Sequence, residues 1–376
     1  MTKTKNRDST VTRRATLGLM AAGTAAVALP ALAADTPSLA SLAKAKGLRF
    51  GTAVPAGMGG VSDPQVAALI ARECNIIVPE NELKMYVTHN KNAMDYNFGP
   101  GDQILAFAKT HNIAMRGHNL FWARDEFTPQ WLKSYDFGPN PKVTAEKLLR
   151  DYIATVADHY GTQLTSWDVV NETIDPQTGK VRENAFSRVL GMDALRIAYE
   201  ATREHLPHMQ LVYNDYMGWE TGGETHRDGV ITLMRWFHDN HVPVNALGLQ
   251  SHLGTDHDVS LGNIKAWTDF LNTVTGLGYD LLITEFDVND RHVMGSIADR
   301  DAVVAKVARE YLDLCLSYKQ TKDVLAWGIT DKYNWLQGFT PREDKLPLRP
   351  APFDADFKPK PLTAAIASAF KAASAR

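Results

Sequence analysis

Two glutamates each close an apolar stretch of the kind that forms a buried strand. Glu285 ends the run from Tyr279, and Glu172 ends the run from Trp167. β-Branched and aromatic residues precede both carboxylates, as is typical of parallel strands that are buried on both faces. Because a carboxylate is costly to desolvate at the end of a buried strand, the presence of each glutamate indicates a chemical role. Two carboxyl groups at two strand ends are what glycosidic hydrolysis requires, one as nucleophile and one as acid and then base.

The strands that would position these groups recur about every 40 residues. The eight expected strands are Leu48–Val54, Ile76–Glu80, Ala114–Trp122, Ser166–Glu172, Gln210–Tyr216, Ala246–Leu253, Asp280–Val288 and Val324–Asp331. Helical patterns separate them, so the sequence predicts an α/β fold, a single (β/α)₈ TIM barrel. The alternative is a doubly wound open sheet, but no Gly-x-Gly-x-x-Gly follows the first strand.

The expected helices carry recognisable start signals. Asp63 followed by Pro64 predicts a capped first turn, and a second helix is expected to begin at Thr144. Further helices are expected over Met192–His205, Thr225–His241, Asn263–Gly278, Ala298–Ser317 and Pro361–Ala373. Long helix-poor stretches follow the third, fourth and eighth strands. Since the loops after the strands form the active face of a barrel, we expect a groove for an extended substrate there.

Residues 1–33 have the features of an export signal. Their basic residues are Lys3, Lys5, Arg7, Arg13 and Arg14. An apolar run to Leu32 follows, with a small-residue cleavage pattern that ends at Ala33. The Arg13-Arg14 pair resembles a twin-arginine signal, and the alternative is an ordinary secretory signal. We therefore expect an exported protein, periplasmic or secreted, with a signal peptide over 1–33 and a catalytic barrel over 34–376.

Composition limits the partners that this chain would bind. Without the five basic residues and one acidic residue of segment 1–33, the totals of 40 and 43 leave a formal charge of −7. That charge argues against nucleic acid and anionic membranes as partners. No 18-residue apolar run follows the N-terminal segment, so no membrane span is expected. Cys74 and Cys315 lie in apolar helical contexts that favour buried free thiols, although an oxidising compartment would also permit a disulfide.

Motifs at seven strand ends point to one family. They are Pro79–Lys84, Gly117–Trp122, Trp167–Glu172, Asn214–Tyr216, Gln250–Leu253, Ile283–Asp287, and Trp327–Asp331 with Trp335. In this order the chain resembles family 10 of the glycoside hydrolases, the endo-β-1,4-xylanases, from about Leu39 to the C-terminus. Any one of these motifs alone would be a weak signal.

The resemblance implies a role for each matching residue. Glu285 would be the nucleophile and Glu172 the acid/base. His252 would hydrogen-bond to Glu285, and Asp287 would orient its imidazole. Support for the same network would come from Gln250 and Asn214, and Asn171 would bind the 2-hydroxyl of the sugar being cleaved. The residues expected to bind other sugars are Glu80, Asn81, Lys84 and His118, walled by Trp122, Trp327 and Trp335, with Tyr216 on the reducing side.

Simple chemistry agrees with these roles. Sugars have apolar faces and polar rims, which tryptophan rings and amide or carboxylate groups match. A lone tryptophan at a strand end is more often a core residue. Only its place within the seven motifs favours a tryptophan that lines a sugar-binding site. A metal site at His118 and His252 is not expected, because their spacing matches no familiar zinc motif. No cofactor is expected.

The sequence departs from the family pattern after the third strand. The family commonly has a histidine after the tryptophan, whereas Ala123 stands here, followed by Arg124, Asp125 and Glu126. Arg124 or Glu126 could add contacts to the non-reducing-side subsites.

The expected activity is hydrolysis of internal β-1,4-xylosidic bonds of xylan by a retaining double displacement, by a monomer without metal. The alternatives are the same mechanism on another β-linked substrate, and an inactive barrel that binds sugar or protein. The intact pair of glutamates argues against an inactive barrel.

Overall fold

The computed structural model describes residues 37–254 and 262–376. The predicted signal peptide over 1–33 lies outside these residues. Within the described ranges, no helix is both long and apolar enough to cross a membrane.

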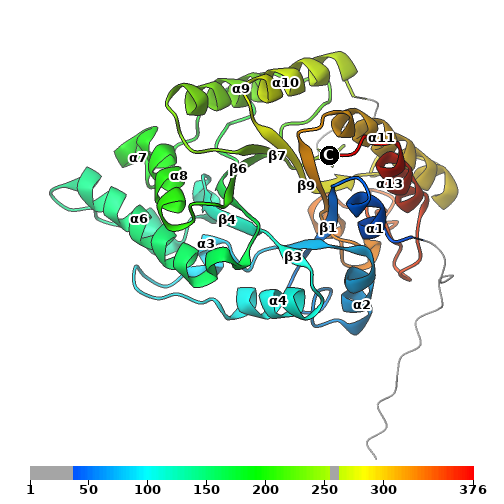
Figure 1. Ribbon diagram of the computed structural model, residues 1–376, viewed down its shortest axis with the longest axis horizontal. Helices are drawn as coiled ribbons and strands as arrows, with labels where there is room; N and C mark the ends of the chain where they lie inside the picture. The colour runs from blue at the N-terminus through cyan, green and yellow to red at the C-terminus, as the bar shows by residue number, and fades with distance from the viewer. Residues whose placement is uncertain (1–36, 255–261) are drawn as a thin grey trace, which may run out of the picture. The chain divides into compact units, whose positions relative to one another are not determined.

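Parallel strands converge at the centre of the structure and form a ring (Figure 1). They are β1 (Arg49–Val54), β2 (Ile76–Pro79), β3 (Ala114–Met115), β4 (Gly117–Trp122), β5 (Ser166–Asn171), β6 (Gln210–Asp215), β7 (Ala246–Leu249), β8 (His252–Leu253), β9 (Asp280–Val288) and β10 (Thr321–Ala326). Only Arg116 separates β3, which pairs with β2, from β4, which pairs with β5. The ring therefore closes through this stretch, and the predicted (β/α)₈ barrel is confirmed.

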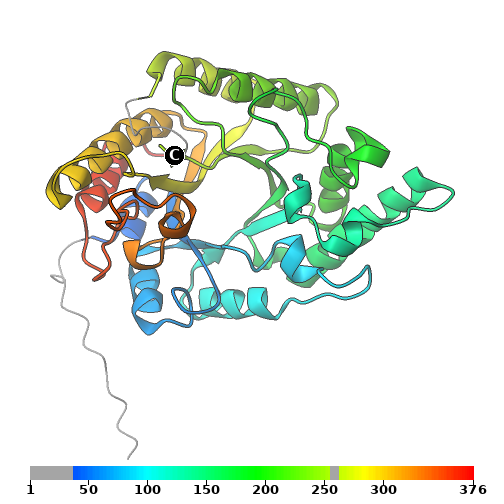
Figure 2. The ribbon, with the colours of Figure 1, turned by 180° about the vertical axis from the view of Figure 1, so that it is seen from behind.

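Helices lie outside the ring, as the view from behind also shows (Figure 2). The long helices are α2 (Pro64–Glu73), α4 (Gly99–Thr110), α6 (Pro141–Tyr160), α8 (Asp193–His205), α9 (Glu224–Asp239), α10 (Ile264–Gly276), α11 (Ile297–Ser317) and α13 (Pro361–Ala372). Each of them except α13, which follows the last strand, connects one strand to the next. Shorter helices are α1 (Leu39–Lys44), α3 (Met85–Thr88), α5 (Gln130–Lys133), α7 (Ser187–Leu190) and α12 (Leu336–Phe339). Most long helices lie within two residues of their predicted bounds.

Some predicted boundaries were wrong. The helix expected from Thr144 begins at Pro141, since a proline needs no hydrogen-bond acceptor in the first helical turn. The eighth strand was expected to reach Asp331, but β10 ends at Ala326. Gly328 follows with a φ of +102°, a conformation that interrupts an extended ladder.

Backbone turns also interrupt the strands that carry the chemistry. β5 ends at Asn171 because Glu172 has a φ of +53°, and Ser251, at +64°, separates β7 from β8. Residues other than glycine adopt this left-handed conformation at a cost, and such residues cluster at functional sites. The turns redirect the side chains at the strand ends toward one opening of the ring.

The core fills both the ring and the layer between strands and helices. Trp167, Trp219 and Trp267 are fully buried, and the two cysteines are buried free thiols, as expected. Asp63 caps α2 by accepting hydrogen bonds from two backbone amides, also as expected.

Candidate active site

A cleft of about 410 Å³ opens where the strands end. Its lining consists of Glu80, Asn81, Lys84, His118, Trp122, Arg124, Phe127, Glu172, Tyr216, Gln250, His252, Glu285, Trp327, Trp335 and Phe339. The fold thus brings almost all the predicted site residues into one cavity. The other three, Asn171, Asn214 and Asp287, are buried and contact the lining from beneath.

Glu285 is fixed on β9 by two hydrogen-bond donors. Nδ2 of Asn214 lies 2.7 Å from its Oε1, and Nε2 of His252 lies 3.2 Å from its Oε2. Burial alone would raise the pKa of Glu285, but the hydrogen bond from His252 and the charges of His118, His252 and Lys84 lower it to about 2. An ionised carboxylate that is held by both oxygens is what a nucleophile requires.

Among the contacts that lower the pKa of Glu285, the hydrogen bond from His252 has the largest effect. Nδ1 of His252 lies 3.1 Å from Oδ2 of Asp287, which also accepts a hydrogen bond of 2.9 Å from the indole of Trp335. Burial alone would lower the pKa of His252, but its contacts with Asp287 and Glu285 raise it to about 10. The imidazolium therefore donates from both nitrogens, one to each carboxylate.

Asn214 connects the nucleophile to the second glutamate. Its Nδ2 also donates to Oδ1 of Asn171 at 2.8 Å, and Asn171 donates to Oε1 of Glu172 at 3.3 Å. The hydroxyl of Thr284 donates to Oδ1 of Asn214 at 2.6 Å. These partners fix which end of the amide faces Glu285.

Glu172 has different partners on its two oxygens. Nε2 of Gln250 donates to Oε1 at 3.0 Å, and Nη1 of Arg124 donates to Oε2 at 3.1 Å. Gln250 was expected in the network of His252 and Glu285, and its backbone carbonyl accepts a hydrogen bond of 3.0 Å from the Glu285 amide while its side chain contacts Glu172. The side-chain contact follows from the turn at Ser251, which separates Gln250 from His252.

A charged layer beneath His118 was missed from the sequence. Asp168 on β5 is fully buried, and it accepts hydrogen bonds from Arg116 and, at 2.8 Å, from Nδ1 of His118. The same nitrogen lies 4.0 Å from Oε1 of Glu285. Asp168 therefore fixes the ring that faces the nucleophile. The signal was available, since a lone aspartate interrupts the apolar run before Glu172.

Polar groups after β2 form another side of the cleft. Lys84 donates to Oδ1 of Asn81 at 3.3 Å, and Tyr86 donates to the same oxygen at 2.7 Å. Burial lowers the pKa of Lys84 and raises that of Glu80. These groups can offer both donors and acceptors to sugar hydroxyls.

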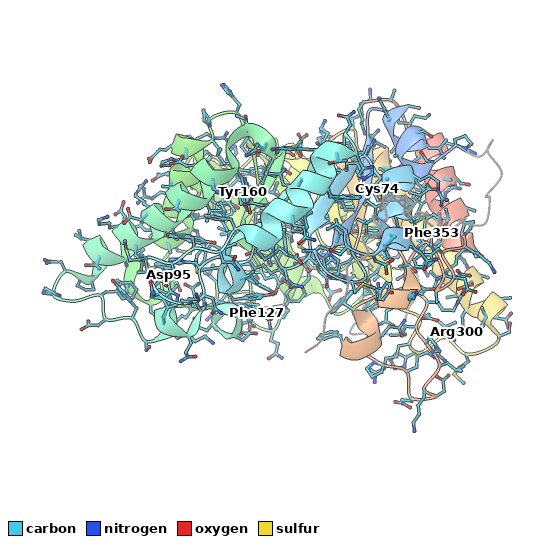
Figure 3. All side chains as sticks on the ribbon, turned by 90° about the horizontal axis from the view of Figure 1, so that it is seen from below. Cys74, Asp95, Phe127, Tyr160, Arg300 and Phe353 are labelled. Carbon is cyan, nitrogen blue, oxygen red and sulfur yellow. The ribbon has the colours of Figure 1, made fainter. Side chains whose placement is uncertain are left out.

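Trp122 is occupied on both faces. The ring of Phe127 stacks on it, with centroids 3.6 Å apart, while Nζ of Lys84 lies 4.5 Å from its centroid. The guanidinium of Arg124 in turn lies 5.3 Å from the Phe127 centroid. Phe127, labelled in Figure 3, lies in the short 3₁₀ turn Asp125–Phe127. Trp122 thus lines the cleft as part of a column rather than as a free face for a sugar.

Other aromatic rings complete the cleft. Trp327 and Trp335 lie near the His252 ring, at 6.3 and 5.0 Å between centroids. Phe339, which is 61% exposed, extends from Trp335 at 4.7 Å and was not predicted. The hydroxyl of Tyr216 accepts a hydrogen bond of 2.9 Å from Arg182. Burial and the charge of Asp215 raise the pKa of Tyr216 to about 12.

The chemistry of the cleft is carried by carboxylates. Among residues 37–254 and 262–376, no group of three or more histidine, cysteine, aspartate or glutamate side chains could hold a metal ion. The arrangement instead offers one ionised carboxylate and one carboxylate with a cationic partner, joined through two amides.

Comparison with known proteins agrees with this geometry. A family model described as "Glycosyl hydrolase family 10" matches residues 38–369. The chain belongs to glycosyl hydrolase family 10. Among similar members of the family is a thermostable celloxylanase of Thermoclostridium stercorarium, 30% identical over 88% of this chain and 86% of that protein. Endo-1,4-beta-xylanase 3 of Hypocrea jecorina is 31% identical over 86% and 83% of the two chains.

Solved structures of family 10 enzymes have the same fold. One is xylanase 10B from Thermotoga petrophila in complex with xylobiose, 28% identical, with a TM-score of 0.79. The match covers 89% of this chain and 98% of that chain. The family 10 barrel is therefore present over nearly its whole length.

Proposed function

We propose that this family 10 enzyme is an endo-1,4-β-xylanase that hydrolyses internal bonds of xylan with retention of configuration. The observation that carries the proposal is the fixation of Glu285 by His252 and Asn214, in one cleft with Glu172. The names of the relatives support xylan, and the complex with xylobiose supports a xylo-oligosaccharide as ligand.

The mechanism follows from the two carboxyl groups. Glu285 attacks the anomeric carbon, and a covalent glycosyl ester forms while the bond to the leaving oxygen breaks. Glu172 gives its proton to that oxygen. In the second step Glu172 takes a proton from water, whose oxygen replaces Glu285 at the anomeric carbon. Asn171, placed beside Glu172 by Asn214, is proposed to bind the sugar 2-hydroxyl.

The remaining assignments extend this proposal. Glu80, Asn81, Lys84 and His118 would bind sugars on the non-reducing side, and Tyr216 would contact the reducing side. We also propose export through the twin-arginine pathway and a monomeric enzyme that binds neither nucleic acid nor membranes. The charge of −7 beyond segment 1–33 supports the last point.

The test is activity of the purified protein on linear xylan, glucuronoxylan and carboxymethyl-cellulose, with products followed over time. We expect a range of short oligomers from xylan and none from Glu285→Ala. Because one relative is a celloxylanase, cellulose is the necessary comparison substrate. Activity on cellulose alone, or substantial xylanase activity in Glu285→Ala, would contradict the proposal.

A further inference from the structure

Arg124 is the cationic partner of Glu172, the proposed acid/base. Its Nη1 donates to Oε2 of Glu172 at 3.1 Å. The other oxygen, Oε1, already accepts hydrogen bonds from Gln250 and Asn171. Within the part of the chain that the structure describes, Oε2 thus has no neutral amide donor, and the guanidinium faces it.

The position of Arg124 is set independently of Glu172. Its Nε donates to Oε1 of Glu126 at 2.8 Å, its Nη2 donates to the same oxygen, and its guanidinium lies over the Phe127 ring. Asp125 anchors the turn by accepting hydrogen bonds from the backbone of Ala185 at 3.2 Å and from Arg188 at 2.6 Å. Arg124 is therefore a fixed donor toward which the Glu172 carboxyl is drawn.

We propose that Arg124 is a positioning residue for the acid/base. It holds Oε2 of Glu172 in the cleft and compensates the negative charge that this oxygen acquires when it gives its proton to the leaving sugar. The inference rests on the proposed function, because it assigns Glu172 as the proton donor. We had expected the unusual Ala123-Arg124 sequence to affect the non-reducing-side subsites. We now propose that it acts on Glu172, the acid/base.

The chemistry explains why such a contact accelerates the reaction. In the form of the enzyme that donates the proton, Glu172 is neutral, and after transfer it is a carboxylate while the sugar leaves as an alcohol. A hydrogen bond from a cation is stronger to the carboxylate than to the neutral acid. Arg124 therefore stabilises the transition state more than the ground state, which is the condition for catalysis. A leaving group that departs as a stable anion needs little protonation and gains little from Arg124.

The test compares two leaving groups in Arg124→Ala. On the acidic side of the pH profile, where Glu172 carries its proton, we expect kcat/KM for xylotetraose, whose leaving group is a sugar, to fall roughly tenfold to a hundredfold, the effect of losing one hydrogen bond to a charged group. With 2,4-dinitrophenyl β-xylobioside we expect the loss to stay below about threefold. Arg124→Lys keeps the cation, so it should recover part of the activity on xylotetraose.

Arg188→Ala is the matched control, since Arg188 binds the same turn through Asp125 but has no contact with Glu172. We expect no difference between the two substrates in this variant. Equal losses on both substrates in Arg124→Ala, or no loss on xylotetraose, would overturn the inference while the wild-type enzyme remains a xylanase. If the wild type cleaves only cello-oligosaccharides, the proposed substrate fails instead. The same comparison with cellotetraose and dinitrophenyl β-cellobioside then decides the role of Arg124.

Discussion

Nε2 of His252 lies 3.2 Å from Oε2 of Glu285, and this contact joins a largely buried cation to a buried carboxylate. Removing either partner leaves a buried charge without compensation, which costs more than the pair contributes. Asp287 on the far side of the imidazole strengthens the arrangement, because it also favours the protonated ring. The ionisation of the nucleophile therefore depends on a histidine.

His252→Asn should move the acidic limb of kcat/KM to higher pH. In the native enzyme Glu285 has a pKa of about 2 and remains ionised in mild acid. Burial raises the pKa of Glu285, and the imidazolium counteracts this effect. Without the imidazolium the pKa of Glu285 therefore rises, so the nucleophile is protonated at higher pH. Measurement of kcat/KM between pH 3 and 7 checks this. His159→Asn, a change at a partly exposed ion pair outside the cleft, is the control. An unchanged limb in His252→Asn would refute the dependence.

The same pair predicts how stability changes with pH. Because the pKa of His252 is raised from 6.5 to about 10, its contribution to stability is complete below about pH 6.5 and is lost as pH rises through 10. The free energy of unfolding should therefore fall more steeply from pH 7 to 10 in the native enzyme than in His252→Asn. Urea unfolding at several pH values measures the difference. Parallel curves for the two proteins would be the contrary result, and His159→Asn should follow the native curve.

Asn214→Asp should inactivate the enzyme with little change in shape. The substitution replaces the Nδ2 donor, which now serves both Glu285 and Asn171, by an acceptor. A second carboxylate beside Glu285 favours a shared proton, and so it removes the ionised nucleophile. We expect kcat to fall about a hundredfold or more, with a stability loss of about 1–3 kcal/mol. Steady-state kinetics and thermal unfolding measure these effects. Asn240→Asp, which removes a similar donor at an exposed helix end, should leave kcat unchanged. Near-native kcat in Asn214→Asp would count against the bridging role.

Phe339→Ala should affect long substrates selectively. The ring is exposed, lines the cleft and extends from Trp335, so it can pack against the apolar face of a distant sugar. We expect KM for xylan to rise roughly threefold to tenfold, with little change for a dinitrophenyl xylobioside. Leu346→Ala removes an exposed apolar side chain that is outside the cleft lining and serves as the control. Equal effects on the two substrates would show that Phe339 acts on the fold instead.

Strand ends were predictable because the apolar runs and the carboxylates that close them are local features. Glu172 and Glu285 could be found in this way, and the seven motifs then predicted most of the residues that line the cleft. Arg124 could be noticed but not placed, since its contact with Glu172 depends on the path of a turn. The two occupied faces of Trp122 were also beyond prediction. Phe127 and Lys84 contact that ring from different segments of the chain, and the spacing of residues within one segment does not predict contacts between segments.

Arg116 has a consequence for how the enzyme becomes active as it folds. Arg116 lies between β3 and β4, where the ring closes, and its backbone amide donates to the carbonyl of Ile77 on β2. Its side chain donates to Asp168 on β5. Asp168 in turn holds His118 toward Glu285. Arg116, at which the ring closes, therefore supports Glu285 indirectly, through Asp168 and His118. A chain with its ring still open would lack this support, so recovery of activity during refolding reports completion of the barrel.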